Sequence, residues 1–115
     1  MLNQLVIVGR LANDIELKKG ENGRDYANIT VAVPRSYKNE DGVYETDFIN
    51  CTLFGPIAEN TAKYMQKGDI LGVKGRVQSN SIEKDGKTEN RTNIIAEKVT
   101  FLSSKGREDQ EHDER

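Results

Sequence analysis

The sequence predicts an all-β fold, a closed barrel of five strands with one α-helix between the third and fourth strands. Three observations support this prediction. Strand patterns and one helix pattern follow in the order strand, strand, strand, helix, strand, strand within about 100 residues. Glycines interrupt strands where a small barrel must bend sharply, and long polar hairpins connect the strands. This combination is typical of the OB fold, and a small mixed sheet covered by one helix is the rival arrangement.

The first two strands are predicted in the N-terminal third of the chain. Residues 5–11 (LVIVGRL) form a β-branched apolar run, which favours a strand buried on both faces or nearly so. Residues 16–19 can continue this strand after a bulge, and the sequence GENG at residues 20–23 predicts a turn. Residues 26–33 alternate apolar and polar side chains, which indicates a half-buried strand whose central part ends at Pro34.

The third predicted strand, residues 47–55, carries the most informative pattern in the chain. A long polar loop or extended hairpin tip at residues 35–45 leads into it. Successive side chains of a strand point to opposite faces, so Ile49, Cys51 and Leu53 form a core face. The other face alternates aromatic and polar side chains: Phe48, Asn50, Thr52 and Phe54.

A wet strand face that carries flat rings suits stacking against flat partners, and nucleobases are the commonest of these. The alternative is that Phe48 and Phe54 cover a second core or a subunit contact. This strand taken alone slightly favours that alternative.

The helix is predicted to begin at Pro56 and to run for about three turns. Gly68 can supply a left-handed cap at its C-terminal end. The next strand, residues 70–77, bends at glycines and is expected to point Leu71, Val73 and Val77 inward and Lys74 and Arg76 outward. A polar hairpin follows with its turn at residues 84–87, and residues 90–102 return as the last strand.

The charges are distributed unevenly along the chain. The net charge is −2, and residues 103–115 supply all of it with three basic and five acidic side chains. We therefore predict one domain at residues 1–102 and an acidic, disordered tail at residues 103–115. The neutral domain has no strong basic patch, so charge alone does not suggest a nucleic-acid partner.

The sequence favours a cytoplasmic protein without a cofactor, a metal or an enzymatic activity. No apolar run is long enough to span a membrane, and Cys51, the single cysteine, fits a reducing compartment. His112, the single histidine, lies in the predicted tail, and no phosphate-binding or dinucleotide motif is present. Some OB barrels are nucleases, which require a cluster of carboxylates that holds a divalent metal. The candidate carboxylates are better interpreted as turn, loop or helix-surface residues: Asp14, Glu16, Asp47 and Glu59.

Short motifs along residues 1–102 resemble, in order and spacing, the bacterial single-stranded DNA-binding proteins. They are MLN at residues 1–3, VGRL at 8–11, ANITVAV at 27–33, DFINC at 47–51, AEN at 58–60, KG at 67–68 and GRV at 75–77. The resemblance implies an OB domain that assembles as a homotetramer. It also implies sequence-independent binding and protection of single-stranded DNA in replication, recombination and repair. The alternative is an OB-fold protein-interaction module of a replication or recombination complex.

The resemblance also implies which residues contact DNA. The stacking aromatics of the family fall on Tyr37, Phe48 and Phe54. Its basic positions match Arg10, Lys18, Arg35, Lys67 and Arg76. A fourth aromatic position, in the last hairpin, falls on Ile82, so we expect weaker engagement of DNA there.

The C-terminus departs from the family pattern. Relatives commonly end in an acidic tip with terminal hydrophobic residues that docks on replication and repair enzymes, whereas residues 108–115 are acidic without an apolar anchor. Partner recruitment by that tip is therefore not expected here. The short form resembles variants that phages or plasmids carry in bacterial cells, or a specialised paralogue.

Overall fold

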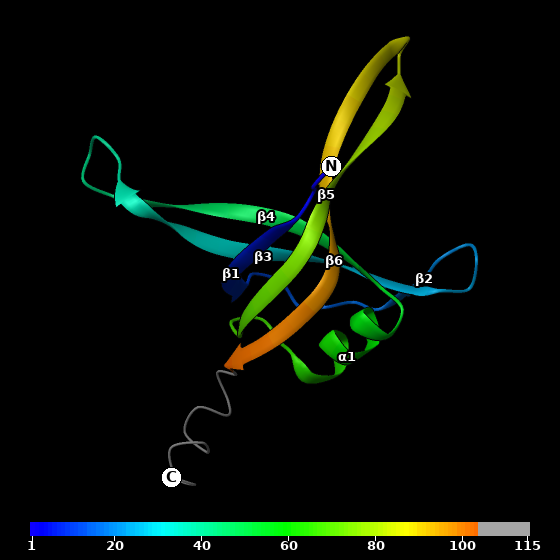
Figure 1. The fold of residues 1–115 in the computed structure, drawn as a ribbon, viewed down its shortest axis with the longest axis horizontal. Coiled ribbons are helices and arrows are strands. Elements are labelled where there is room, and N and C mark those ends of the chain that lie inside the picture. The colour runs from blue at the N-terminus through cyan, green and yellow to red at the C-terminus, as the bar shows by residue number, and fades with distance from the viewer. Residues whose placement is uncertain (104–115) are drawn as a thin grey trace, which may run out of the picture.

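The computed structural model describes residues 1–103, which form six strands and one helix (Figure 1). The predicted acidic tail, apart from Ser103, lies outside the described residues. In chain order the elements are β1 (Leu5–Leu11), β2 (Lys18–Lys19), β3 (Asp25–Lys38), β4 (Tyr44–Phe54), α1 (Pro56–Tyr64), β5 (Ile70–Lys84) and β6 (Lys87–Ser103).

The five long strands close into a barrel, as predicted. The sheet order is β1, β5, β6, β4, β3, β2, and β1 also pairs with β3. The β4–β6 pair is parallel and the other pairs are antiparallel. The helix α1 lies between the third and fourth long strands in sequence, and the two-residue strand β2 extends the sheet beside β3. This arrangement is consistent with the OB fold.

The core fills the barrel with side chains from all five long strands. Fully buried members include Leu11, Ile29, Val31, Leu53, Leu71 and Val73. The alternation predicted for β3 and β4 is confirmed, because Ile29 and Val31 pair with Cys51 and Ile49 on the same face. The helix packs against β3, β4 and β6 and buries Ala58 and Thr61.

The helix begins as predicted but ends earlier than three turns. Pro56 occupies its first turn, after Gly55 at a positive φ of 61°. Met65 is already extended, and its side chain is buried in the core, which stops the helix at Tyr64. The predicted cap at Gly68 is therefore wrong. Gly68 has a positive φ in the following turn, where its N–H donates to the carbonyl of Leu11 at 2.8 Å.

The prediction that β1 is buried on both faces is also wrong. Leu11 lies in the core, whereas Val6 and Val8 are 67% and 51% exposed. A five-stranded barrel covers only the inner face of each strand, so the alternate side chains of β1 need another partner or remain in water. The structure thus leaves an apolar outer face on β1.

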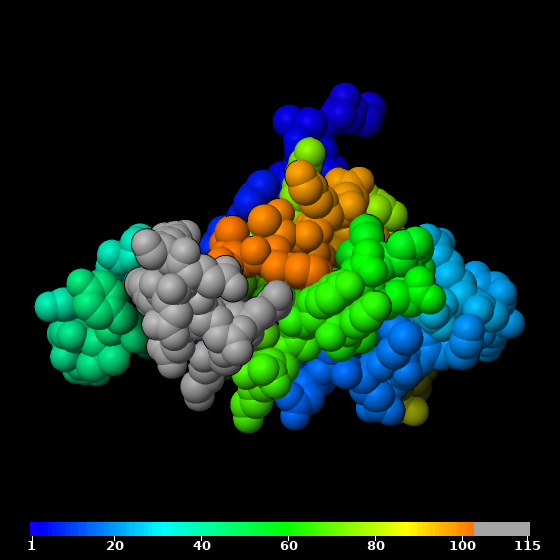
Figure 2. All heavy atoms as spheres, turned by 90° about the horizontal axis from the view of Figure 1, so that it is seen from below, coloured from blue at the N-terminus to red at the C-terminus, as the bar shows by residue number. Residues whose placement is uncertain are grey.

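Two hairpins extend well beyond the barrel (Figure 1). The β3–β4 hairpin includes most of the segment predicted as a polar loop, because β3 continues to Lys38 after an irregularity that starts at Pro34. The β5–β6 hairpin turns at Asp85 and Gly86, both with positive φ, as predicted for residues 84–87. Figure 2 shows the β3–β4 tip and the residues around β2 projecting on opposite sides of the molecule.

A bulge interrupts the pairing of β5 with β6. The register jumps by one residue at Glu97, opposite Lys74 and Gly75. A Cβ at Gly75 would lie 2.2 Å from the carbonyl oxygen of Ile95, so the strands approach too closely there for any side chain. Val77 pairs with Ile94 on the inner face, as predicted, but it is 39% exposed because it lies past the end of the core.

Candidate nucleic-acid interface

The outer face of the β3–β4 pair forms a continuous strip. Directly paired residues of an antiparallel sheet point to the same side. Tyr26 pairs with Phe54, Asn28 with Thr52, Thr30 with Asn50, and Ala32 with Phe48. We call these eight residues the outer strip. The predicted division of β4 into a core face and an aromatic, polar face is therefore present in the structure.

Hydrogen bonds hold the polar middle of the outer strip in place. The hydroxyl of Thr30 donates to Asn50 Oδ1 at 2.9 Å, and the hydroxyl of Thr52 donates to Asn28 Oδ1 at 2.9 Å. Asn93 of β6 donates its Nδ2 hydrogen to Thr52 Oγ1 at 2.6 Å. Thr52 is buried by these contacts rather than open to water. The amide oxygens of Asn28 and Asn50 accept these bonds, so their NH2 groups remain as potential donors.

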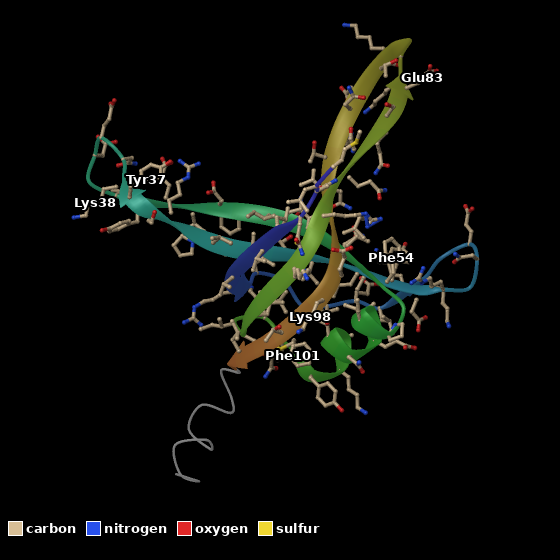
Figure 3. All side chains as sticks on the ribbon, viewed as in Figure 1. Tyr37, Lys38, Phe54, Glu83, Lys98 and Phe101 are labelled. Carbon is tan, nitrogen blue, oxygen red and sulfur yellow. The ribbon has the colours of Figure 1, made fainter. Side chains whose placement is uncertain are left out.

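The predicted stacking residues lie far apart. Phe48 is 67% exposed and Phe54 is half-buried, and the six residue steps from one to the other span about 20 Å of strand. Tyr37 is 64% exposed near the end of the β3–β4 hairpin, on the opposite side of the molecule from Phe54 (Figure 3). One flat ligand cannot touch two of these rings, so each ring would need its own partner.

Two predicted basic residues lie at the Phe48 end of the outer strip. Arg10 pairs with Ala32, which pairs with Phe48, so all three point to one face. The Arg10 Nη1 group donates to the carbonyl of Gly68 at 3.0 Å, which holds it beside the turn that contains Lys67. Both basic side chains are exposed.

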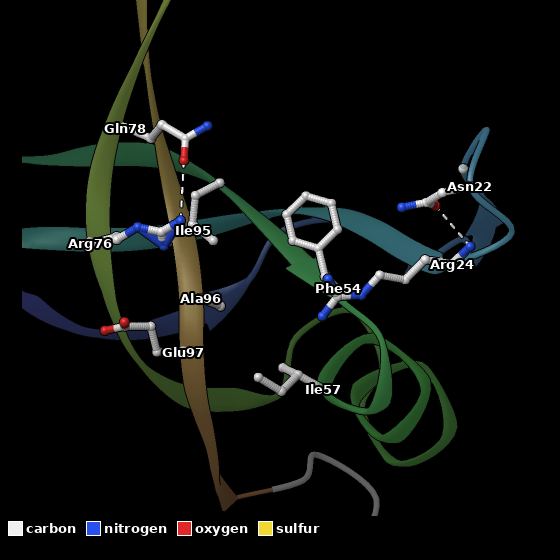
Figure 4. A pocket seen from close by; sticks show the side chains of 10 residues that line it. Asn22, Arg24, Phe54, Ile57, Arg76, Gln78, Ile95, Ala96 and Glu97 are labelled. Carbon is white, nitrogen blue, oxygen red and sulfur yellow. Dashed lines mark hydrogen bonds between the residues drawn. The ribbon is translucent and has the colours of Figure 1, made fainter.

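Two other predicted basic residues lie at the Phe54 end. Lys18 pairs with Tyr26, which pairs with Phe54, and this row again shares one face. Arg76 of β5 lines a cavity of about 440 Å³ beside Phe54 (Figure 4). The outer strip thus has cations at both ends and neutral polar groups between them.

Sequence reasoning missed two residues at the Phe54 end. Tyr26 continues the alternation of Asn28 and Thr30, but only the β3–β4 register places it beside Phe54. Arg24 stacks its guanidinium over the Phe54 ring, with Cζ 5.6 Å from the ring centroid. Nothing in the local sequence signals that contact, because the turn at residues 20–23 is what brings Arg24 to the ring.

Arg35 differs from the other predicted cations because two carboxylates already neutralise it. Its Nη2 lies 2.9 Å from Asp47 and its Nη1 lies 2.7 Å from Glu45. Asp47 pairs with Val33 and so points away from the face of Phe48. The hydrogen bond from Arg35 lowers the pKa of Asp47 below its ordinary value of 3.8. The structure therefore does not bring Arg35 together with the outer strip.

Two observations concern metal-binding and thiol groups in the described residues. In residues 1–103, no group of three or more histidine, cysteine, aspartate or glutamate side chains is placed to hold a metal ion. Burial raises the pKa of the Cys51 thiol to about 11, so it stays protonated and unreactive at neutral pH. In the same part of the chain, no helix is long and apolar enough to cross a membrane.

Comparisons with known proteins agree with this geometry. A model described as the single-strand binding protein family matches residues 2–102. A single-stranded DNA-binding protein of Oceanobacillus iheyensis is 47% identical over 107 residues, which cover 92% of this chain and 66% of the relative. Single-stranded DNA-binding protein B of Bacillus subtilis is 45% identical over 109 residues, which cover 94% of this chain and 96% of the relative. The chain thus spans just under two thirds of the first relative and nearly all of the second.

The ion pairs of Arg35 predict a dependence of stability on pH. Asp47 has a lowered pKa in the folded state, so its charge stabilises the fold above its unfolded pKa of about 3.8 and this contribution is lost as the pH falls further. We expect Asp47→Asn to lower the melting temperature slightly at pH 7 and to leave it unchanged at about pH 2. Thermal unfolding at both pH values tests this, with Glu89→Gln, in a longer exposed pair, as control. Equal melting temperatures of wild type and Asp47→Asn at pH 7 would contradict it.

Proposed function

The chain belongs to the single-strand binding protein family, and from this we propose that it binds single-stranded DNA without regard to sequence and protects it during replication, recombination and repair. One observation supports this proposal most strongly. The outer strip exposes Phe48 and half-exposes Phe54 on a polar surface, with basic side chains at both ends. Aromatic rings that pack a core are buried, so exposed rings among hydrogen-bonded amides fit contact with a ligand better than a purely structural role.

We propose that bases stack on Phe48, Phe54 and Tyr37. Stacking on an aromatic side chain contributes about 1–3 kcal/mol per base and tolerates any sequence, because every base has a flat face. Duplex DNA should bind poorly, since its bases already stack on one another. The gap of about 20 Å between Phe48 and Phe54 holds at most about six nucleotides at the 3.4 Å spacing of a B-form strand, and fewer when the strand is extended.

Phosphates would be held at the two ends of the outer strip by Arg10 and Lys67 on one side and by Lys18 and Arg76 on the other. These four side chains have no ion pair with any carboxylate of residues 1–103, so their charge is available. Affinity should therefore fall as salt rises. Arg35 stays a prediction with less support, because binding a phosphate would require it to leave Asp47 and Glu45.

The remaining expectations concern the hairpin and the assembly. Ile82 lies on the β5–β6 hairpin and offers no aromatic face, so this hairpin should add little stacking. The apolar outer face of β1 at Val6 and Val8 supports self-association, with a homotetramer as the expected form. Replication and recombination proteins as partners, a bacterial cytoplasmic location and a phage or plasmid origin remain proposals from the resemblance alone.

Removing both aromatic side chains should weaken DNA binding strongly. We expect Phe48→Ala/Phe54→Ala to lose roughly 2–6 kcal/mol of binding free energy for oligo-dT, because two independent stacking contacts add. Fluorescence anisotropy with labelled oligo-dT and a matched duplex measures this. Tyr64→Ala serves as control, since Tyr64 is an exposed aromatic on α1. If the wild type bound neither DNA, the strip would instead fit the alternative of a protein-interaction module.

Self-association should depend on the outer face of β1. We expect Val6→Lys/Val8→Lys to give a smaller particle than the wild type in light scattering, because charged side chains cannot be buried against a second copy without a partner. Val43→Lys, at the exposed end of the β3–β4 hairpin, is the matched control. A wild-type monomer would exclude the homotetramer but would leave base stacking untouched.

A further inference from the structure

The cavity beside Phe54 combines an aromatic ring with two arginine side chains. Its volume is about 440 Å³, within the range of small-molecule sites. Arg24 comes from the turn before β3, Phe54 from the end of β4, and Arg76 from β5 (Figure 4). Ile95 of β6 and Ile57 of α1 add apolar surface. Separate parts of the fold therefore converge on this cavity.

The backbone of Arg24 is fixed at the edge of this cavity. Its carbonyl accepts the N–H of Gly20 at 2.8 Å, and its own N–H donates to Asn22 Oδ1 at 3.0 Å. The carbonyl of the next residue, Asp25, accepts the N–H of Gly55 at 2.7 Å, which ties the turn to the end of β4. The Arg24 guanidinium lies over the ring of Phe54. The backbone thus fixes Arg24 at several points before any ligand binds.

The charges of Arg24 and Arg76 are both available to a ligand. Within residues 1–103, no carboxylate forms an ion pair with either of them, in contrast to Arg35. Arg76 donates to the neutral Gln78 Oε1, at 3.2 Å. Glu97 is the one carboxylate among the described residues that line the cavity. The lining therefore carries a net positive charge.

Resting on the proposed function, we propose that this cavity is a subsite for one nucleotide of the bound strand, in which Arg24 is a phosphate-binding residue. The base stacks on the face of Phe54 that Arg24 leaves open. Arg24 and Arg76 hold the phosphates on either side of that nucleotide, because a guanidinium donates two parallel hydrogen bonds to phosphate oxygens. Glu97 accepts a hydrogen bond from an N–H group on the edge of the base, and every base can offer one.

This ligand class fits the cavity better than its simpler rivals. An apolar ligand would leave two guanidinium groups beside the cavity without a negatively charged partner. An inorganic anion would use the arginines but not the ring or the isoleucines. A nucleotide satisfies both parts of the lining, and its position at the end of the outer strip continues the path from Phe48 to Phe54.

The test replaces Arg24 by methionine, which keeps the aliphatic stem over the ring but removes the charge. We expect Arg24→Met to weaken binding to labelled oligo-dT about tenfold at moderate salt, because the charge-assisted hydrogen bonds of one guanidinium to the strand no longer form. The slope of log K against log salt should become shallower by about 0.7, because one phosphate fewer is neutralised. Lys63→Met is the matched control, since Lys63 lies over Tyr64 on α1, at 5.3 Å from its centroid. Lys63→Met should change neither the affinity for oligo-dT nor the salt slope.

Two further variants separate this inference from a packing role. If Arg24 only supports the Phe54 ring, Arg24→Met will have no effect in a Phe54→Ala background. In the Phe54→Ala background we instead expect Arg24→Met to make the salt slope shallower as well. Arg24→Lys, which keeps the charge, should keep the wild-type slope. An unchanged slope in Arg24→Met would overturn the subsite while the proposed function stood. A wild type that binds no single-stranded DNA would instead remove the proposed function itself.

Discussion

The register between β3 and β4 is the constraint on which both the core and the proposed binding face depend. It is unbroken from the pair Tyr26–Phe54 to the pair Pro34–Thr46. A slip of one residue would point the Leu53 side chain toward water and the Phe54 side chain toward the core, because strand side chains alternate. Burial of each large aliphatic side chain contributes about 1.5–3 kcal/mol, so the core holds the register firmly. The outer strip is thus positioned by side chains that never contact a ligand.

The distribution of ion pairs explains how a neutral domain can bind a polyanion. Arg35, which lies away from the outer strip, is paired with both Asp47 and Glu45. Arg10 and Arg76, at the two ends of the strip, keep their charges unpaired within the described residues. Net charge therefore says little about binding here, because local pairing decides which cations are available.

Local sequence predicted those parts of the structure that depend on local rules. The period of two placed Phe48 and Phe54 opposite Ile49 and Leu53, and Pro56 marked the start of the helix. Features that depend on long-range pairing were missed. The apolar run at Val6 and Val8 does not reveal which face the barrel covers, and Thr52 is buried only because Asn93 reaches it from β6. Arg24 and Tyr26 join the candidate site through turn geometry and strand register, which no local pattern encodes.

In the proposed binding mode, single-stranded DNA lies along the outer strip. A crystal structure of the chain with a short single-stranded oligonucleotide tests it most directly. We expect one base on Phe48, another on Phe54, and the intervening nucleotides over the hydrogen-bonded residues between them, such as Asn28 and Asn50. A strand bound over α1, or on the opposite face of the β3–β4 hairpin beside Arg35, with both phenylalanine rings uncovered, would contradict it.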